Sequence, residues 1–291
     1  MMLRLVCVIL VAFFIINPEI NAAFADDETV RIVGYGRFKK TAWKQYGNSM
    51  TDYANDLAAQ GWEITRFSKA GVVLKKTGRT YKVNIMAFGD WNGTSNEKYN
   101  SDDTAYANAL LDEGWDLEYF TKVGVVLKKT GATNAIKMLW SSEWNKIARE
   151  HHGGNDTEVA RVFAAEGWEI VQLSNDGIIL KKTGKEHDVK VLSISEWNTI
   201  AREQHEGDDN KMANAYAHGG WEIVQLNATG IVLQKTGTKH EYKIVSLNEW
   251  GTIAEEKHGG DDNKMANAFA RDGWEIAELS YAGVVLKRPR K

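Results

Sequence analysis

A repeat of 53 residues constrains the fold of this chain more than any other feature. A Gly-Trp-Glu/Asp-Ile/Leu motif occurs five times, and its tryptophans stand 53 residues apart at Trp62, Trp115, Trp168, Trp221 and Trp274. A second aromatic position has the same spacing, at Phe38, Trp91, Trp144, Trp197 and Trp250. A fixed period of this size is typical of repeat architectures. The repeats fill the sequence from about residue 30 onward, which leaves no room there for a separate catalytic domain.

Each unit is predicted to have the order β-α-α-β-β, giving an α+β fold. In the fourth copy the predicted elements are a strand at 189–192, a helix N-capped by Ser195, a helix running from Asp208-Asp209 to Gly219-Gly220, and strands at 221–226 and 231–235. The last two strands form a hairpin and are apolar on both faces, so we expect both to lie inside a covered sheet. The predicted units are 30–82, 83–135, 136–188, 189–241 and 242–291.

Two arrangements of the five units are open at this stage. If Val30–Val33 pairs with the final strand near Val284–Lys287, the array closes into a ring, as propellers close by joining their terminal strands. If each opening strand pairs within its own unit, the array stays open. We favour the open array slightly, because it needs no special curvature.

The first 25 residues are predicted to be a cleaved signal peptide. Arg4 precedes an apolar run from Leu5 to Ile16, and Ala23-Phe24-Ala25 has the small-x-small pattern of a cleavage site. The run is shorter than the roughly 20 residues that span a bilayer, so we expect no membrane span. The protein is therefore predicted to be exported to the periplasm or the medium. Its single cysteine, Cys7, falls in this segment, and the exported chain would hold no disulfide.

The charge balance argues against nucleic acid as a partner. The chain has 36 Lys and Arg against 39 Asp and Glu, a net charge of −3. Binding to a phosphate backbone normally needs a basic patch.

The last unit resembles a family of small bacterial domains of unknown function. The residues that carry the resemblance are Glu241-Tyr242-Lys243-Ile244-Val245, then Gly273-Trp274-Glu275-Ile276, then Leu286-Lys287-Arg288-Pro289. This chain departs from the family pattern by an extra helix, near Glu249 to His258. The resemblance implies a small α+β unit and no particular activity.

Acidic loops and histidines that recur at fixed repeat positions are candidate binding residues. Asp208, Asp209, Asp261 and Asp262 open the second helices of the last two units, where they either cap the helix or bind calcium. His152, His205 and His258 end the first helices of the last three units. There they either stabilise the C-terminal end of the helix through its dipole or bind a metal together with the acidic loops. We assign no cofactor, and calcium is the one that the loops suggest.

Two tryptophans outside the repeat register, Trp43 and Trp140, are further candidates for ligand stacking. Lys-Thr-Gly at Lys235 resembles a β-lactamase box, and Ser95-Asn96-Glu97-Lys98 supplies the Ser-x-x-Lys motif. The box recurs at the repeat period and Ser-Asp-Asn is absent, so we read it as a strand end and turn.

These observations predict an exported, non-enzymatic repeat protein that binds or scaffolds a glycan, a protein or copies of itself multivalently. The alternatives are a hydrolase acting on envelope polysaccharide and a calcium-dependent adhesion module. The sequence leaves the ligand and the oligomeric state open.

Overall fold

The computed structural model describes residues 28–174 and 177–290, and within them the chain forms five α+β units. Each unit has an opening strand, two helices and a hairpin, so the predicted β-α-α-β-β order is confirmed. The predicted signal peptide, with Cys7, lies outside the described residues. None of the helices in the described part of the chain is long and apolar enough to cross a membrane.

The elements recur at the period of the sequence. The opening strands are β1 (Val30–Val33), β4 (Val83–Met86), β7 (Ile136–Trp140), β10 (Val189–Leu192) and β13 (His240–Val245). The first helices are α1 (Tyr35–Gln45), α3 (Phe88–Tyr99), α5 (Ser141–His152), α7 (Ile194–His205) and α9 (Leu247–His258). The second helices are α2 (Met50–Ala59), α4 (Asp103–Asp112), α6 (Asp156–Ala165), α8 (Asp209–His218) and α10 (Asp262–Arg271). The first hairpin strands are β2 (Trp62–Phe67), β5 (Trp115–Thr121), β8 (Trp168–Leu173), β11 (Trp221–Leu226) and β14 (Glu275–Ser280). The second hairpin strands are β3 (Val72–Lys76), β6 (Gly124–Lys129), β9 (Gly177–Lys182), β12 (Ile231–Lys235) and β15 (Gly283–Pro289).

Each unit contains one antiparallel three-stranded sheet with the second hairpin strand at its centre. In the fourth unit the order is β10-β12-β11, with Val191 opposite Val232 and Ile223 opposite Leu233. The expectation that both hairpin strands lie inside the sheet is therefore wrong for β11, which is an edge strand. Its register shifts after Ile223, so that Val224 bulges out of the pairing.

The first helix of the fourth unit begins two residues earlier than predicted. Its N-cap is Ser193, whose hydroxyl accepts the Glu196 N–H at 3.1 Å, while the Glu196 carboxylate accepts the Ser193 N–H at 2.8 Å. This reciprocal capping box satisfies two backbone donors at once, which Ser195 would not do. The second helix begins after Asp208, as predicted.

The glycine of each Gly-Trp motif has a left-handed backbone that links helix to hairpin. At Gly167 φ is +78°, and an added Cβ would lie 2.8 Å from the Cα of Gly184, at the far end of the hairpin. A side chain at this position would be strained and would push the hairpin apart.

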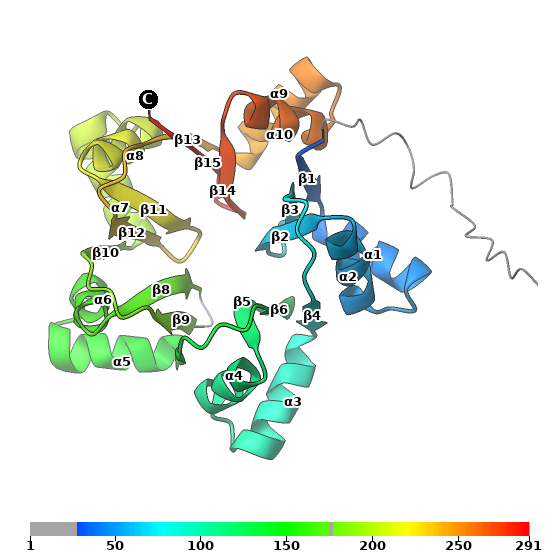
Figure 1. Ribbon diagram of the computed structural model, residues 1–291. Coiled ribbons are helices and arrows are strands. Elements are labelled where there is room, and N and C mark those ends of the chain that lie inside the picture. Colours follow the sequence, from blue (N-terminus) through cyan, green and yellow to red (C-terminus); the bar gives the residue numbers. More distant parts are fainter. Residues whose placement is uncertain (1–27, 175–176, 291) are drawn as a thin grey trace, which may run out of the picture.

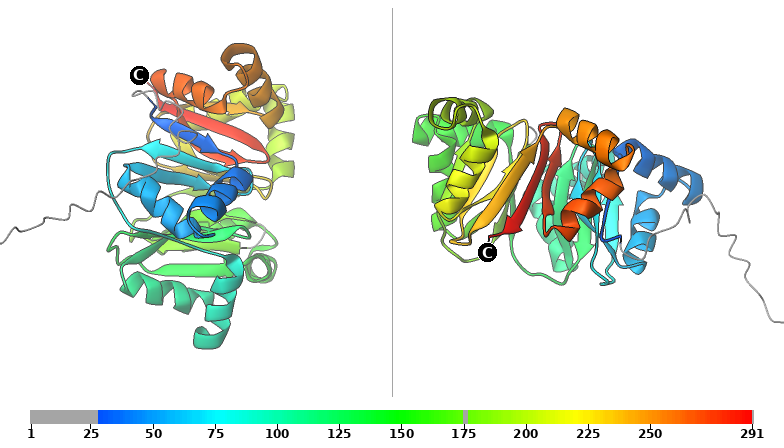
Figure 2. Two further views of the ribbon diagram at one scale, coloured as in Figure 1. Left: turned by 90° about the vertical axis from the view of Figure 1, so that its right-hand side faces the viewer. Right: turned by 90° about the horizontal axis from the view of Figure 1, so that it is seen from above.

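The five units form a closed ring with sheets inside and helices outside (Figures 1 and 2). The second helix of each unit packs against the opening strand of the next, as α2 does on β4 and α10 on β1. On α2, Asn55 exchanges two hydrogen bonds with the backbone of Val83, at 2.8 and 2.9 Å. On α10, Asn267 makes the same pair of bonds with Val30, at 2.6 and 3.0 Å.

The strand pairing that the open array assumed is present, and the ring closed by terminal strands is not; the first and last units instead meet through a helix–strand contact that the sequence analysis did not consider. β1 pairs with β3 of its own unit, and the sheets do not join into a continuous barrel. The ring closes because helices rather than strands join the units. The first and last units meet at a boundary that we call the seam. It has a shared apolar core, in which Val30 and Val73 pack with residues of the last unit such as Met265.

Candidate functional site: the central cavity

The acidic pairs at the starts of the second helices have structural roles. The carboxylate of Asp208 accepts the N–H groups of Asn210 and Lys211 at 2.8 and 3.0 Å, and that of Asp261 caps α10 in the same way. Asp209 accepts the indole N–H of Trp197 at 2.8 Å, and Asp262 accepts that of Trp250 at 3.0 Å. The first aspartate therefore caps the helix and the second positions the tryptophan of the preceding helix.

The three repeated histidines do not come together. His152, His205 and His258 are the half-buried last residues of α5, α7 and α9, which lie on the outside of separate units (Figure 1). Across residues 28–174 and 177–290, no group of three His, Cys, Asp or Glu side chains is arranged to hold a metal ion.

The two tryptophans outside the repeat register have different environments. Trp140 ends β7 and is half-buried, with its ring 6.2 Å from that of Phe120. Trp43 lies on α1 with 64% of its surface exposed. Trp43 is thus available for contact with a partner, whereas Trp140 packs within the second and third units.

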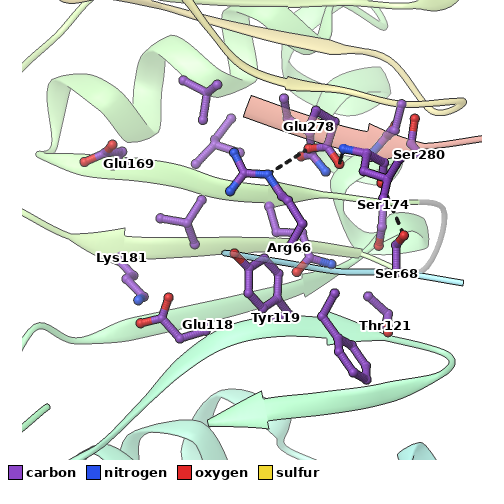
Figure 3. Close-up of a pocket in the computed structure, with 18 residues that line it drawn as sticks. Arg66, Ser68, Glu118, Tyr119, Thr121, Glu169, Ser174, Lys181, Glu278 and Ser280 are labelled. Carbon is purple, nitrogen blue, oxygen red and sulfur yellow. Dashed lines mark hydrogen bonds and ion pairs between the residues drawn. The ribbon is translucent and has the colours of Figure 1, made fainter. Parts of the chain in front are cut away.

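A cavity of about 350 Å³ lies where the inner edge strands of all five units meet (Figure 3). Its charged and hydrogen-bonding lining residues are Arg66 and Ser68 of the first unit, Glu118, Tyr119 and Thr121 of the second, Glu169, Gln172, Ser174 and Lys181 of the third, Gln225 and Asn227 of the fourth, and Glu278 and Ser280 of the fifth. Volumes of this order are typical of sites for small ligands.

Four salt bridges join neighbouring units, and one of them contributes Lys181 to the lining of the cavity. Each joins a lysine of a second hairpin strand to the acidic residue after the motif tryptophan in the preceding unit. The pairs are Lys128–Glu63, Lys181–Asp116 at 2.8 Å, Lys287–Glu222 at 2.7 Å and Lys75–Glu275 at 3.3 Å. We call this set the lysine ladder. The last pair spans the seam of the ring.

The lysine ladder is interrupted between the third and fourth units. The acidic residue there is Glu169, and the position of the lysine is taken by Gln234. No hydrogen bond or ion pair of Glu169 is found within the described part of the chain, and this half-buried side chain lines the cavity.

One charged pair crosses the middle of the cavity. Arg66 Nε lies 3.8 Å from Glu278 Oε2 across the seam, and this buried Nε has no hydrogen-bond partner among the described residues. Burial raises the pKa of Glu278 to about 7, against the opposing effect of Arg66. Beside them, the Tyr119 hydroxyl donates to the Thr65 carbonyl, and burial raises its pKa to about 12.

Glu118 is a second cavity carboxylate without an ion pair within 4 Å in the described residues. The lysines whose charges act on Glu118 are Lys181 and Lys128, both engaged in the ladder. Burial raises the pKa of Glu118 above its usual range despite these two lysines. Burial of this carboxylate therefore outweighs the positive charge of the two lysines.

The other end of the cavity is lined by short polar side chains at the ends of the inner strands. Figure 3 shows Ser68, Thr121, Ser174 and Ser280 on the side away from Glu169, Lys181 and Glu118. Several of these residues bond to the preceding unit, as Asn227 does to the Leu173 carbonyl at 2.7 Å and Ser68 to the Leu279 carbonyl at 3.2 Å. The cavity is thus charged at one end and neutral at the other.

Reasoning from the sequence missed this site because it looked for positions that repeat. The cavity residues occupy positions that vary among the copies: Arg66, Tyr119, Gln172, Gln225 and Glu278 are equivalent, as are Thr65, Glu118, Val171, Val224 and Ala277. The available signal was that the same position carries a different residue in each of several otherwise similar units. It becomes informative only once the ring is known to bring these positions together.

No protein-family model, curated protein or solved structure matches the chain. Any assignment of function therefore depends on the geometry of the cavity.

Proposed function

We propose that the chain is a non-enzymatic binding protein, acting outside the cytoplasm, that holds one small polar molecule in the central cavity. The observation that carries this proposal is the distribution of variation among the units. Residues that build the ring repeat, whereas the inner edge strands supply different polar groups to one shared cavity. A single site built from different residues is typical of a protein that binds one specific ligand. Multivalent binding would use equivalent surfaces on the five units instead.

A hydrolase of envelope polysaccharide is less well supported by the same cavity. A volume of about 350 Å³ suits a small molecule and not a polymer chain lying across the protein. The acidic residues of the lysine ladder are mostly engaged in ion pairs between units, and Glu278 is paired with Arg66, so Glu118 and Glu169 are the cavity carboxylates without an ion pair among the described residues. Turnover of a glycan that disappears in both Glu118→Gln and Glu169→Gln, with binding intact, would support the hydrolase instead.

A thermal-shift screen of the purified protein tests the proposal. The panel would contain small amines, zwitterions, carboxylates and neutral sugars, with calcium and EDTA as additions. A ligand that binds only the folded state raises its stability by about 2.7 kcal/mol at 100 times its dissociation constant.

Val224→Trp is designed to block the cavity, because Val224 lines it on β11 and a bulky side chain there would fill it. Val171→Trp, on β8, is an independent second block. We expect at least one class of compound to stabilise the wild-type protein and neither folded variant. Stabilisation that persists in both variants, or its absence with every compound, would overturn the proposal.

A further inference from the structure

The gap in the lysine ladder points to the charge of the ligand. We infer that the cavity binds a small organic cation whose ammonium group lies beside Glu169, where the other unit boundaries have a lysine. This inference rests on the proposed function and adds the chemical class of the ligand.

The four complete boundaries define what Glu169 lacks. In each, an ammonium group reaches the carboxylate of the preceding unit, and the pairs flanking the gap, Lys181–Asp116 and Lys287–Glu222, have separations of 2.8 and 2.7 Å. The side chains of these two pairs are between 13 and 25% exposed, so they are largely desolvated. Glu169 is half-buried at the equivalent position, and its cross-strand neighbour Lys181 is bound to Asp116, so a counter-charge there would be favourable. Gln234 is neutral and cannot supply one.

The cavity as a whole has a deficit of positive charge. Arg66 is paired with Glu278, and Lys181 with Asp116, so both of these cations are already neutralised. Among the described residues, Glu118 on β5 and Glu169 on β8 are then lining carboxylates without an ion pair of their own, toward the same end of the cavity (Figure 3). A ligand with one or two ammonium groups would supply the missing charge.

An organic cation fits this arrangement better than a metal ion. No group of three suitable ligands is gathered in the described residues, and the two carboxylates come from different strands. The buried Arg66 Nε, which is in an ion pair with Glu278 but has no hydrogen-bond partner among the residues described, offers a donor in the same cavity to an oxygen of the ligand. The hydroxyl groups at the opposite end can contact the polar body of a ligand, which a bare ion would leave unused.

A series of compounds of equal length separates charge from size. The probes are 1,4-diaminobutane, 4-amino-1-butanol and 1,4-butanediol, which carry two, one and no ammonium groups. Isothermal titration calorimetry at low salt should show affinity that falls in that order, with no detectable binding of the diol.

Gln234→Lys is the decisive variant, because it should supply the missing ammonium group from the chain itself. We expect it to weaken the binding of 1,4-diaminobutane at least tenfold while raising the melting temperature, since it completes the ladder. Glu169→Gln should weaken binding to a similar extent. Glu222→Gln is the matched control: it removes the equivalent carboxylate of the next unit, which does not line the cavity, and should leave affinity within twofold.

The outcomes separate the inference from the proposed function. Unchanged diamine affinity in Gln234→Lys, or an equal loss in Glu169→Gln and Glu222→Gln, would overturn the inference. If neutral or anionic compounds bind the wild type and are blocked by Val224→Trp, while no amine binds, the inference fails and the proposed function stands. If no compound of any class binds, both fail.

Discussion

At the scale of single residues, comparison of the five units indicates which side chains are replaced together. Four units have a tryptophan on the first helix whose indole N–H donates to an aspartate on the second, as Trp91 does to Asp103 at 2.8 Å. The first unit has Phe38 and Met50 at the equivalent positions, so both partners are replaced together. This is the expected pattern when an indole and a carboxylate are buried as a pair, because either one left alone would be unsatisfied.

A double-mutant cycle at Trp91 and Asp103 tests this dependence. Trp91→Phe leaves the carboxylate of Asp103 buried without its indole donor and should cost about 2–3 kcal/mol. Adding Asp103→Met, which reproduces the pair of the first unit, should recover at least about 1 kcal/mol of coupling energy. Urea unfolding of the four proteins measures these differences. Additive costs would show that the two residues are replaced independently.

Glu278 gives the protein a predicted pH dependence of stability. Its pKa of about 7 in the folded state lies above the ordinary value of 4.5, so the folded protein holds this proton more tightly than the unfolded chain. Stability from this group is therefore fully present below about pH 4.5 and is lost as the pH rises through about 7, by at most about 3 kcal/mol.

Glu278→Gln isolates this effect. The free energy of unfolding of the wild type, minus that of the variant, should fall as the pH rises from about 5 to 8, measured by urea titration at several pH values. The control is Glu222→Gln, which removes a carboxylate that is paired with Lys287 outside the cavity and supplies the reference trend. A flat difference for Glu278→Gln would mean that the carboxylate titrates alike in the folded and unfolded states.

At the scale of elements, the sequence predicted the unit well because local signals determine it. Helix caps such as Asp208, chain-reversing glycines such as Gly220 and the alternation of apolar residues act over a few residues, and the structure follows them closely. The error at Ser195 has the same local origin, since a competing serine two positions earlier has Glu196 at the right distance to complete a capping box.

The contacts between elements of different units could not be predicted in this way. The link from α10 to β1 depends on Asn267, which as a helix residue gives no local sign that it will bond to a strand 237 positions earlier. The same contact recurs at Asn55, Asn108 and Asn214, so repetition shows that the position matters without showing what it touches. The cavity was hidden for a related reason, because its walls come from all five units and exist only after the ring has closed.

At the scale of the whole molecule, closure removes the distinction between inner and terminal units. An open array exposes an unpartnered face at each end and needs capping repeats to cover it. Here the first and last units contact each other through Asn267 and Val30 as successive units do. The sequence differences of the first unit are therefore not needed to cover an exposed end. Closure also brings Arg66 of the first unit beside Glu278 of the fifth, so the cavity is complete only in the ring.

The ring predicts that the chain can be opened at another boundary without loss of stability. The link between β3 and β4 has six residues, 77–82, and joining Arg290 to Glu28 through three added residues would give a seam link of the same length. A circular permutant that uses this link and starts at Asn134, between β6 and β7, should melt within a few degrees of the wild type and keep its ligand. Deleting 28–33, which removes β1, should instead expose the apolar face of α10 and lower the melting temperature by ten degrees or more, because one unit boundary is lost. Calorimetry of the three proteins measures their melting temperatures. A permutant as unstable as the deletion variant would mean that stability depends on the order of the units along the chain and not on the closed ring.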